Sequence, residues 1–133
     1  MKLECLDHVA LSVRDVTLSV AWYRDVLGLE RLHQDAWGDR PAVVGAGDTG
    51  LALSPVPGGD GAGGGEGSVG HQVPAMRHVA FRTDAAGFAA AQSHLRERGV
   101  PYTFEDHGIS HSIYVLDPDG HRIEVTTYLP AAG

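Results

Sequence analysis

Two histidines and one glutamate stand at matching positions of two similar stretches of sequence. His8 begins the run His-Val-Ala-Leu, and His78 begins the run His-Val-Ala-Phe. Glu124 lies in Arg-Ile-Glu-Val, which matches Gly-Leu-Ala-Leu around Ala52. Two imidazoles and a carboxylate form a ligand set for Fe(II) or a similar divalent ion and leave coordination positions for substrate and oxygen or water. The sequence therefore predicts a metal site of His8, His78 and Glu124.

The three ligands are expected on strand faces that point away from a helix-packed core. Side chains alternate between the two faces of a strand. His8 then shares a face with Ala10, and His78 shares one with Ala80. An alanine two residues after each histidine leaves space for a ligand.

Tyr114 and His107 are the candidate catalytic residues. Asp-Pro-Asp-Gly at 117–120 is typical of a type I turn followed by a left-handed glycine. With that bulge Tyr114 lies opposite Glu124, and without it Ile113 does. A phenol there can orient a substrate oxygen or share its proton. His107 precedes the same strand and can act as an acid or base near neutral pH, or be a solvated loop histidine.

Both flanks of the chain predict the element order β-α-β-β-β. Asp15 and Asp84 can cap helices that end at Leu27 and Arg98. Strands are expected at residues 6–13, 30–33, 42–44, 51–54, 77–82, 102–105, 112–116 and 122–127. The buried helix faces are expected to carry Leu18, Trp22 and Val26, and Phe88, Ala91 and Leu95. The matching order indicates an internal repeat.

Residues 57–75 separate the two repeats. Residues 57–74 hold eight of the 18 glycines and little that could pack into a core. We expect one domain in total, made of a first module at 1–56, a glycine-rich linker at 57–75, a second module at 76–129 and a tail at 130–133.

Composition excludes several classes of partner. The formal charge of −7 argues against nucleic acid and anionic membrane surfaces, which require clustered Lys and Arg. No apolar run approaches the roughly 18 residues of a membrane span, and no signal peptide is visible, which predicts a cytoplasmic protein. Cys5 stands alone, so no intrachain disulfide is possible.

These motifs resemble the vicinal oxygen chelate superfamily of glyoxalases, bleomycin resistance proteins, fosfomycin-resistance enzymes and extradiol dioxygenases. The resemblance is carried by His8 in LDHVALSV, by WYRDVLGL at 22–29 and by YVLDPDGHRIE from Tyr114 to Glu124. It implies an α+β fold in which two βαβββ modules form a half-open mixed β-barrel around a divalent metal. It also implies a small-molecule substrate chelated through two adjacent oxygens, and often a homodimer.

The site pattern is most similar to extradiol dioxygenases, which carry a tyrosine ten residues before the glutamate and a histidine slightly earlier. This resemblance implies an oxidoreductase with Fe(II), or Mn, Ni, Co or Zn, on His8, His78 and Glu124. Tyr114 would then orient a catecholic substrate, and His107 would move protons. The alternatives are a non-redox lyase or isomerase of the glyoxalase type and an antibiotic-binding protein of the bleomycin type.

Two other subfamilies fit less well. Glyoxalase I has a carboxylate ligand where this chain has Ala52. Fosfomycin-resistance enzymes have a hydroxyl residue where this chain has Ala10, and basic residues beyond the final glutamate that this chain lacks. The sequence therefore disfavours both activities.

Overall fold

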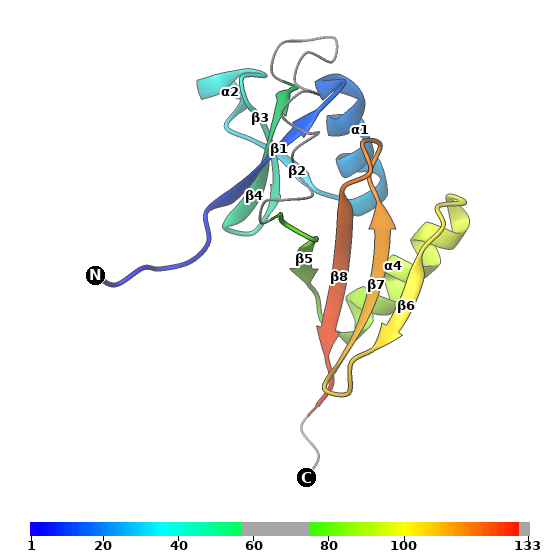
Figure 1. Cartoon of the computed structure of the whole chain (residues 1–133). Helices are drawn as coiled ribbons and strands as arrows, with labels where there is room; N and C mark the ends of the chain where they lie inside the picture. Colours follow the sequence, from blue (N-terminus) through cyan, green and yellow to red (C-terminus); the bar gives the residue numbers. More distant parts are fainter. Residues whose placement is uncertain (57–74, 131–133) are drawn as a thin grey trace. The chain divides into compact units, whose positions relative to one another are not determined.

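The computed structural model describes residues 1–56 and 75–130 (Figure 1). The chain divides into two compact units, residues 1–74 and 75–133, which we call unit 1 and unit 2. The predicted glycine-rich stretch at 57–74 and the tail residues 131–133 lie outside the described residues.

Unit 1 contains one four-stranded mixed sheet with the strand order β1-β4-β3-β2. Its elements are β1 (His8–Val13), α1 (Val16–Leu27), β2 (Glu30–Leu32), α2 (Gln34–Trp37), β3 (Ala42–Ala46) and β4 (Thr49–Pro55). Strands β1 and β4 are parallel, and the other pairs are antiparallel. The short helix α2 was not expected from the sequence.

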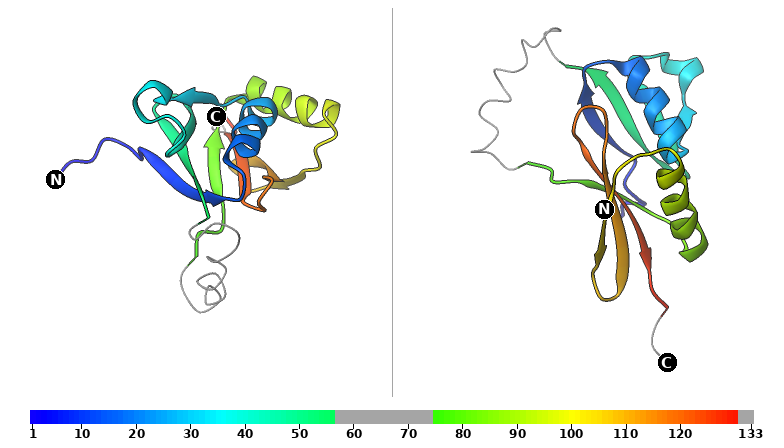
Figure 2. Two further views of the ribbon diagram at one scale, coloured as in Figure 1. Left: turned by 90° about the horizontal axis from the view of Figure 1, so that it is seen from above. Right: turned by 90° about the vertical axis from the view of Figure 1, so that its right-hand side faces the viewer.

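Unit 2 repeats this topology with the strand order β5-β8-β7-β6 (Figure 2). Its elements are β5 (Val79–Arg82), α4 (Ala85–Glu97), β6 (Thr103–Asp106), β7 (Ser110–Leu116) and β8 (Arg122–Tyr128). Strands β5 and β8 are parallel, and the hairpins β6–β7 and β7–β8 are antiparallel. The predicted α+β class and the βαβββ order of each module are confirmed. None of the described helices is long and apolar enough to cross a membrane.

Both long helices begin at the predicted capping residues. The Asp15 carboxylate accepts a hydrogen bond from the backbone N–H of Leu18 at 3.0 Å. The Asp84 carboxylate accepts one from the N–H of Gly87 at 2.8 Å. Such bonds satisfy donors that have no partner within the helix. Gly28 ends α1 in the left-handed conformation at φ 71°, which glycine adopts without steric cost.

Replacing the cap of α4 should destabilise unit 2. We expect Asp84→Ala to lower the free energy of unfolding by about 1 kcal/mol, because the first turn loses its side-chain acceptor. Urea unfolding followed by circular dichroism measures this change. Asp84→Asn keeps an acceptor and should stay close to the wild type. Equal losses in both variants would contradict the capping role.

The buried face of α1 differs from the prediction. Val26 is buried as predicted, but Leu18 is 55% exposed and Trp22 is half-buried. Ser19 and Tyr23 are fully buried instead. Helix α1 contacts β3 and β4. For α4 the prediction holds better, since Phe88 and Leu95 are buried.

The two parallel strand pairs have the same register. Ala10 pairs with Ala52 across β1 and β4, and Ala80 pairs with Glu124 across β5 and β8. Ala52 therefore occupies in unit 1 the position that Glu124 occupies in unit 2, as the sequence match predicted. His8 and His78 each stand two residues before the alanine of their pair.

Candidate metal centre

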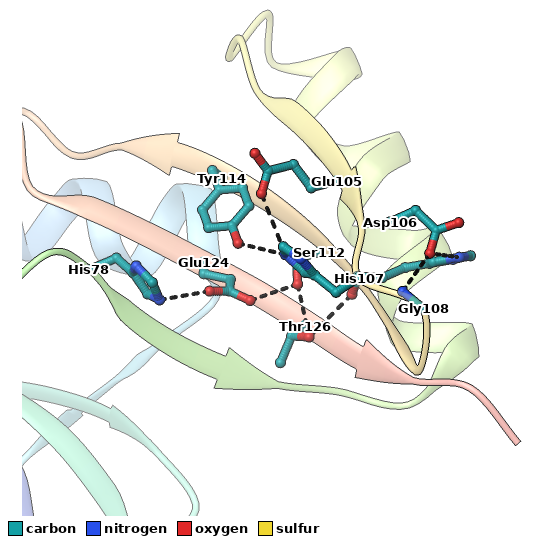
Figure 3. A network of polar contacts seen from close by, with 10 residues as sticks. His78, Glu105, Asp106, His107, Gly108, Ser112, Tyr114, Glu124 and Thr126 are labelled. Carbon is teal, nitrogen blue, oxygen red and sulfur yellow. Dashed lines mark hydrogen bonds and ion pairs between the residues drawn. The ribbon is translucent and has the colours of Figure 1, made fainter. Parts of the chain in front are cut away.

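His78 and Glu124 face each other across two neighbouring strands of unit 2 (Figure 3). His78 immediately precedes β5, and Glu124 lies near the start of β8. The His78 Nε2 atom is 2.9 Å from Glu124 Oε1. The Glu124 side chain is 10% exposed, and the His78 side chain is 37% exposed. An accessible imidazole and a largely buried carboxylate form two thirds of the predicted ligand set.

Ser112 holds the Glu124 carboxylate from the side opposite His78. Its hydroxyl donates to Glu124 Oε2 at 2.6 Å and lies 3.0 Å from the hydroxyl of Thr126. Ser112 is fully buried. Outer-shell hydrogen bonds of this kind orient a ligand for its metal. Ser112 was not predicted from the sequence, although it shares the strand face of Tyr114.

Loss of the Ser112 hydroxyl should weaken metal binding without removing a ligand. We expect Ser112→Ala to lower the affinity for a divalent ion by roughly 10–100-fold. Competition with a chromophoric chelator measures that affinity. Ser110→Ala makes the same change on the same strand outside this network and should bind metal like the wild type. Equal affinity in both variants would show that Glu124 needs no such support.

Tyr114 lies directly opposite Glu124 across β7 and β8. The predicted turn sets this register, because the Asp117 N–H donates to the His121 carbonyl at 2.9 Å and Gly120 has φ 89°. Tyr114 is 8% exposed. The bulged register, and not the alternative with Ile113, is therefore confirmed.

His107 follows β6 and reaches the phenol of Tyr114. Its Nε2 atom lies 2.9 Å from the Tyr114 hydroxyl and 3.4 Å from Glu105 Oε2 (Figure 3). The His107 side chain is 41% exposed. His107 thus lies between solvent and the phenol of Tyr114, and Tyr114 stands opposite Glu124 in the strand pairing.

The surroundings of Tyr114 favour its neutral form. Burial raises the pKa of the phenol above its ordinary value, and the negative charges of Glu124 and Glu105 raise the pKa further. The pKa of the phenol is therefore higher in the folded protein than in the unfolded chain. The contribution of Tyr114 to the free energy of unfolding is fully present below about pH 10 and is lost as the pH rises through the folded pKa.

An alkaline titration tests this environment. In protein treated with a chelator, the near-ultraviolet absorbance difference between wild type and Tyr114→Phe should titrate with a midpoint above pH 10. Glu105→Gln should move that midpoint toward lower pH, because one of the two negative charges is removed. A midpoint at or below the ordinary value would contradict the buried, acid-flanked position of the phenol.

His8 lies in unit 1, on the exposed face of β1. Its Nδ1 atom is 2.8 Å from Asp7 Oδ2, which leaves Nε2 for a metal. This role of Asp7 was not predicted, although Asp7 adjoins His8 in the chain. Among the residues that the structure describes, no three His, Cys, Asp or Glu side chains converge on one point. The complete set of His8, His78 and Glu124 therefore stays a prediction.

Residues 5–125 match the model of the Glyoxalase/Bleomycin resistance protein/Dioxygenase superfamily. The chain belongs to this superfamily. Metallothiol transferase FosB of Staphylococcus epidermidis is 29% identical to this protein, and the match covers 96% of this chain and 84% of FosB. Glutathione transferase FosA of Serratia marcescens is 30% identical, over 92% and 80%.

Solved structures of the superfamily share the fold. A glyoxalase/dioxygenase from Nostoc punctiforme superposes with a TM-score of 0.71 at 22% identity, covering 95% of this chain and 92% of that one. Fosfomycin resistance protein FosX from Mesorhizobium loti superposes with a TM-score of 0.65 at 22% identity, covering 96% and 95%.

The comparisons overturn one prediction. The site pattern favoured a dioxygenase-like oxidoreductase, and that assignment is wrong, because the similar proteins FosA and FosB are named transferases. The superfamily predicted from the three motifs is confirmed. The name metallothiol transferase indicates that this relative depends on a metal, which is consistent with the predicted metal site.

Proposed function

We propose that this protein is a metal-dependent thiol transferase that joins a low-molecular-weight thiol to a small oxygen-bearing electrophile. The observation that carries the proposal is the pair of His78 and Glu124, fixed by Ser112 and flanked by the phenol of Tyr114. The similarity to proteins named metallothiol transferase and glutathione transferase supports the thiol as co-substrate.

The residues present fit a divalent ion. A nitrogen and a carboxylate oxygen 2.9 Å apart, with the second carboxylate oxygen already bonded to Ser112, present two donors toward one point. His8 would supply the third ligand, from the same chain or from a second copy in a homodimer. When bound, the ion would act as a Lewis acid on a substrate oxygen. The preference for Fe(II) rested on oxygen chemistry, so Mn, Co, Ni and Zn become equal candidates.

Tyr114 and His107 can supply the proton that the reaction requires. A sulfur–carbon bond forms, a carbon–oxygen bond of the electrophile breaks, and the thiol proton passes to solvent. The freed oxygen then needs a proton, which the neutral phenol of Tyr114 can donate. His107, 2.9 Å from that phenol and partly exposed, can return a proton from water.

One feature of the sequence bears on the substrate. Ala10 provides no hydroxyl group two residues after His8. We expect this departure to change which electrophile is accepted while the transfer chemistry is kept. Fosfomycin is therefore one probe among several, and the preferred substrate need not be a phosphonate.

The test is direct detection of the product. Purified protein loaded with Mn(II), Fe(II), Co(II), Ni(II) or Zn(II) is incubated with reduced glutathione or cysteine and with a panel of small epoxides that includes fosfomycin. Mass spectrometry should find an adduct with the summed mass of both reactants, which disappears after chelator treatment. Metal-dependent conversion of the electrophile without consumption of thiol would overturn the transferase assignment.

A further inference from the structure

Unit 1 contains a pocket of about 300 Å³ beside His8. Apolar side chains from three neighbouring strands of one sheet line it, namely Leu32, Val43 and Ala52. Ala52 replaces the carboxylate of the second repeat, so the pocket is open where Glu124 fills the corresponding position. A ligand in this pocket would lie against the predicted metal ligand of unit 1.

An exposed aromatic pair forms another wall. Trp37 at the end of α2 is 52% exposed and lines the pocket together with His33. Their ring centroids are 4.8 Å apart. His33 adopts φ 59°, the left-handed conformation that is rare outside glycine and often found at ligand sites. The two rings are tilted by 50° to each other, so the exposed ring of Trp37 alone offers a flat apolar surface to a planar group.

Arg40 also lines this pocket, and its guanidinium supplies a positive charge. In the described part of the chain, no carboxylate pairs with its guanidinium. Nearby Arg31 differs, since its guanidinium bonds the Asp39 carboxylate at 3.1 Å and the Gly38 carbonyl at 2.9 Å. A guanidinium presents paired donors that match carboxylate and phosphonate oxygens.

The two carboxylates that line the pocket do not neutralise Arg40. Asp7 is bonded to His8 at 2.8 Å. Asp48 follows β3, whereas Arg40 precedes it, so the two charges lie beyond opposite ends of that strand. The pocket therefore combines the exposed aromatic ring of Trp37 with the guanidinium of Arg40.

We infer that this pocket binds the electrophilic substrate, and that this substrate joins a flat unsaturated or aromatic group to a carboxylate or phosphonate. The planar group packs on Trp37, and the anionic group pairs with Arg40. This inference rests on the proposed function for the identity of the occupant as electrophile. The binding chemistry follows from the pocket alone.

Fluorescence of Trp37 can test the pocket without any turnover. The chain has two tryptophans, so Trp22→Phe leaves Trp37 as the only reporter. Benzoate, phenylphosphonate and the neutral benzamide are titrated as probes. We expect saturable quenching by the two anions and roughly tenfold weaker binding of benzamide, since it lacks the charge-assisted hydrogen bonds. The tighter anion identifies the substrate's acidic group.

Two further variants locate the cation. In the same background, Arg40→Met should reduce anion binding to the level of benzamide. Arg24→Met removes an equal charge from α1, where Arg24 pairs with Asp25 at 3.0 Å, and should change nothing. Circular dichroism of each variant confirms that the fold is kept.

Several results would overturn the inference. One is equal binding of benzoate and benzamide, and another is the absence of saturable quenching. A third is displacement of benzoate by reduced glutathione at similar concentration, because the pocket would then be the thiol site. If the anions bind as expected and no thiol adduct forms with any electrophile, the pocket stands and the transferase assignment fails. Adducts formed without anion binding would support the transferase assignment and overturn the role of the pocket.

Discussion

Replacing Glu124 with alanine is expected to abolish both stoichiometric metal binding and thiol transfer. Glu124 is the only carboxylate of the predicted set, and the imidazole of His78 faces it directly at 2.9 Å. Two histidines without the carboxylate hold a divalent ion far more weakly than the complete set. Metal analysis after loading and gel filtration, alongside the adduct assay, measures both losses.

Glu124→Ala also removes the carboxylate that accepts the hydrogen bond of the buried Ser112 hydroxyl, so a second variant separates this loss from the loss of the metal ligand. Glu124→Gln retains an oxygen for Ser112 but loses the charge, and we expect a folded protein with little metal. Glu105→Ala removes an exposed carboxylate from β6, the edge strand beyond β7, and should keep its metal. Full metal content in Glu124→Gln would contradict the predicted metal centre.

Replacing Tyr114 with phenylalanine is expected to leave metal content unchanged and to lower the rate of transfer roughly 10²–10⁴-fold. Positioned acids contribute factors of this size, and the phenol is the neutral acid beside the predicted metal ligands. The ring still packs against His78, whose ring centroid is 5.9 Å from that of Tyr114. Steady-state kinetics and metal analysis of the same sample measure both quantities.

Tyr102→Phe is the matched control. It removes a phenol from the same unit, where the Tyr102 hydroxyl accepts a hydrogen bond from Arg96 at 2.8 Å. Its transfer rate should stay near the wild-type value. An unchanged rate in Tyr114→Phe would mean that the proton comes from another donor, and His107 would be the next residue to replace.

Much of the fold could be predicted because its signals are local. Asp15 and Asp84 begin helices, Gly28 ends one, and the turn before His121 sets the β7–β8 register that brings Tyr114 to Glu124. The internal repeat added the long-range information. It matches Ala52 with Glu124, and the registers of the two parallel strand pairs agree with that match.

Other features depend on tertiary packing and could not be predicted from the sequence. Helix α1 has apolar residues on more than one face, so periodicity favoured Leu18 over the buried Tyr23. Helix α2 is only four residues long and has no side-chain cap. Ser112 reaches Glu124 across a strand pair, twelve positions apart in the chain, and a lone serine gives no signal for such a bond.

The wrong assignment of activity also has a structural cause. The ten-residue interval from Tyr114 to Glu124 follows from hairpin geometry, since the two residues are direct partners across β7 and β8 with a bulged turn between them. Any member of the superfamily with this hairpin can show the same interval. The spacing therefore reports the fold, and it says little about which bond the protein makes or breaks.

The equal registers of β1–β4 and β5–β8 suggest how the two repeats have specialised. Each repeat carries two of the four matched positions, and one ion does not require all four. Unit 2 has a histidine and a carboxylate at its two positions, whereas unit 1 has His8 and Ala52. The small side chain of Ala52 lines the same pocket as Trp37. One repeat therefore carries two of the three predicted metal ligands, and the other combines the third ligand with room for a substrate.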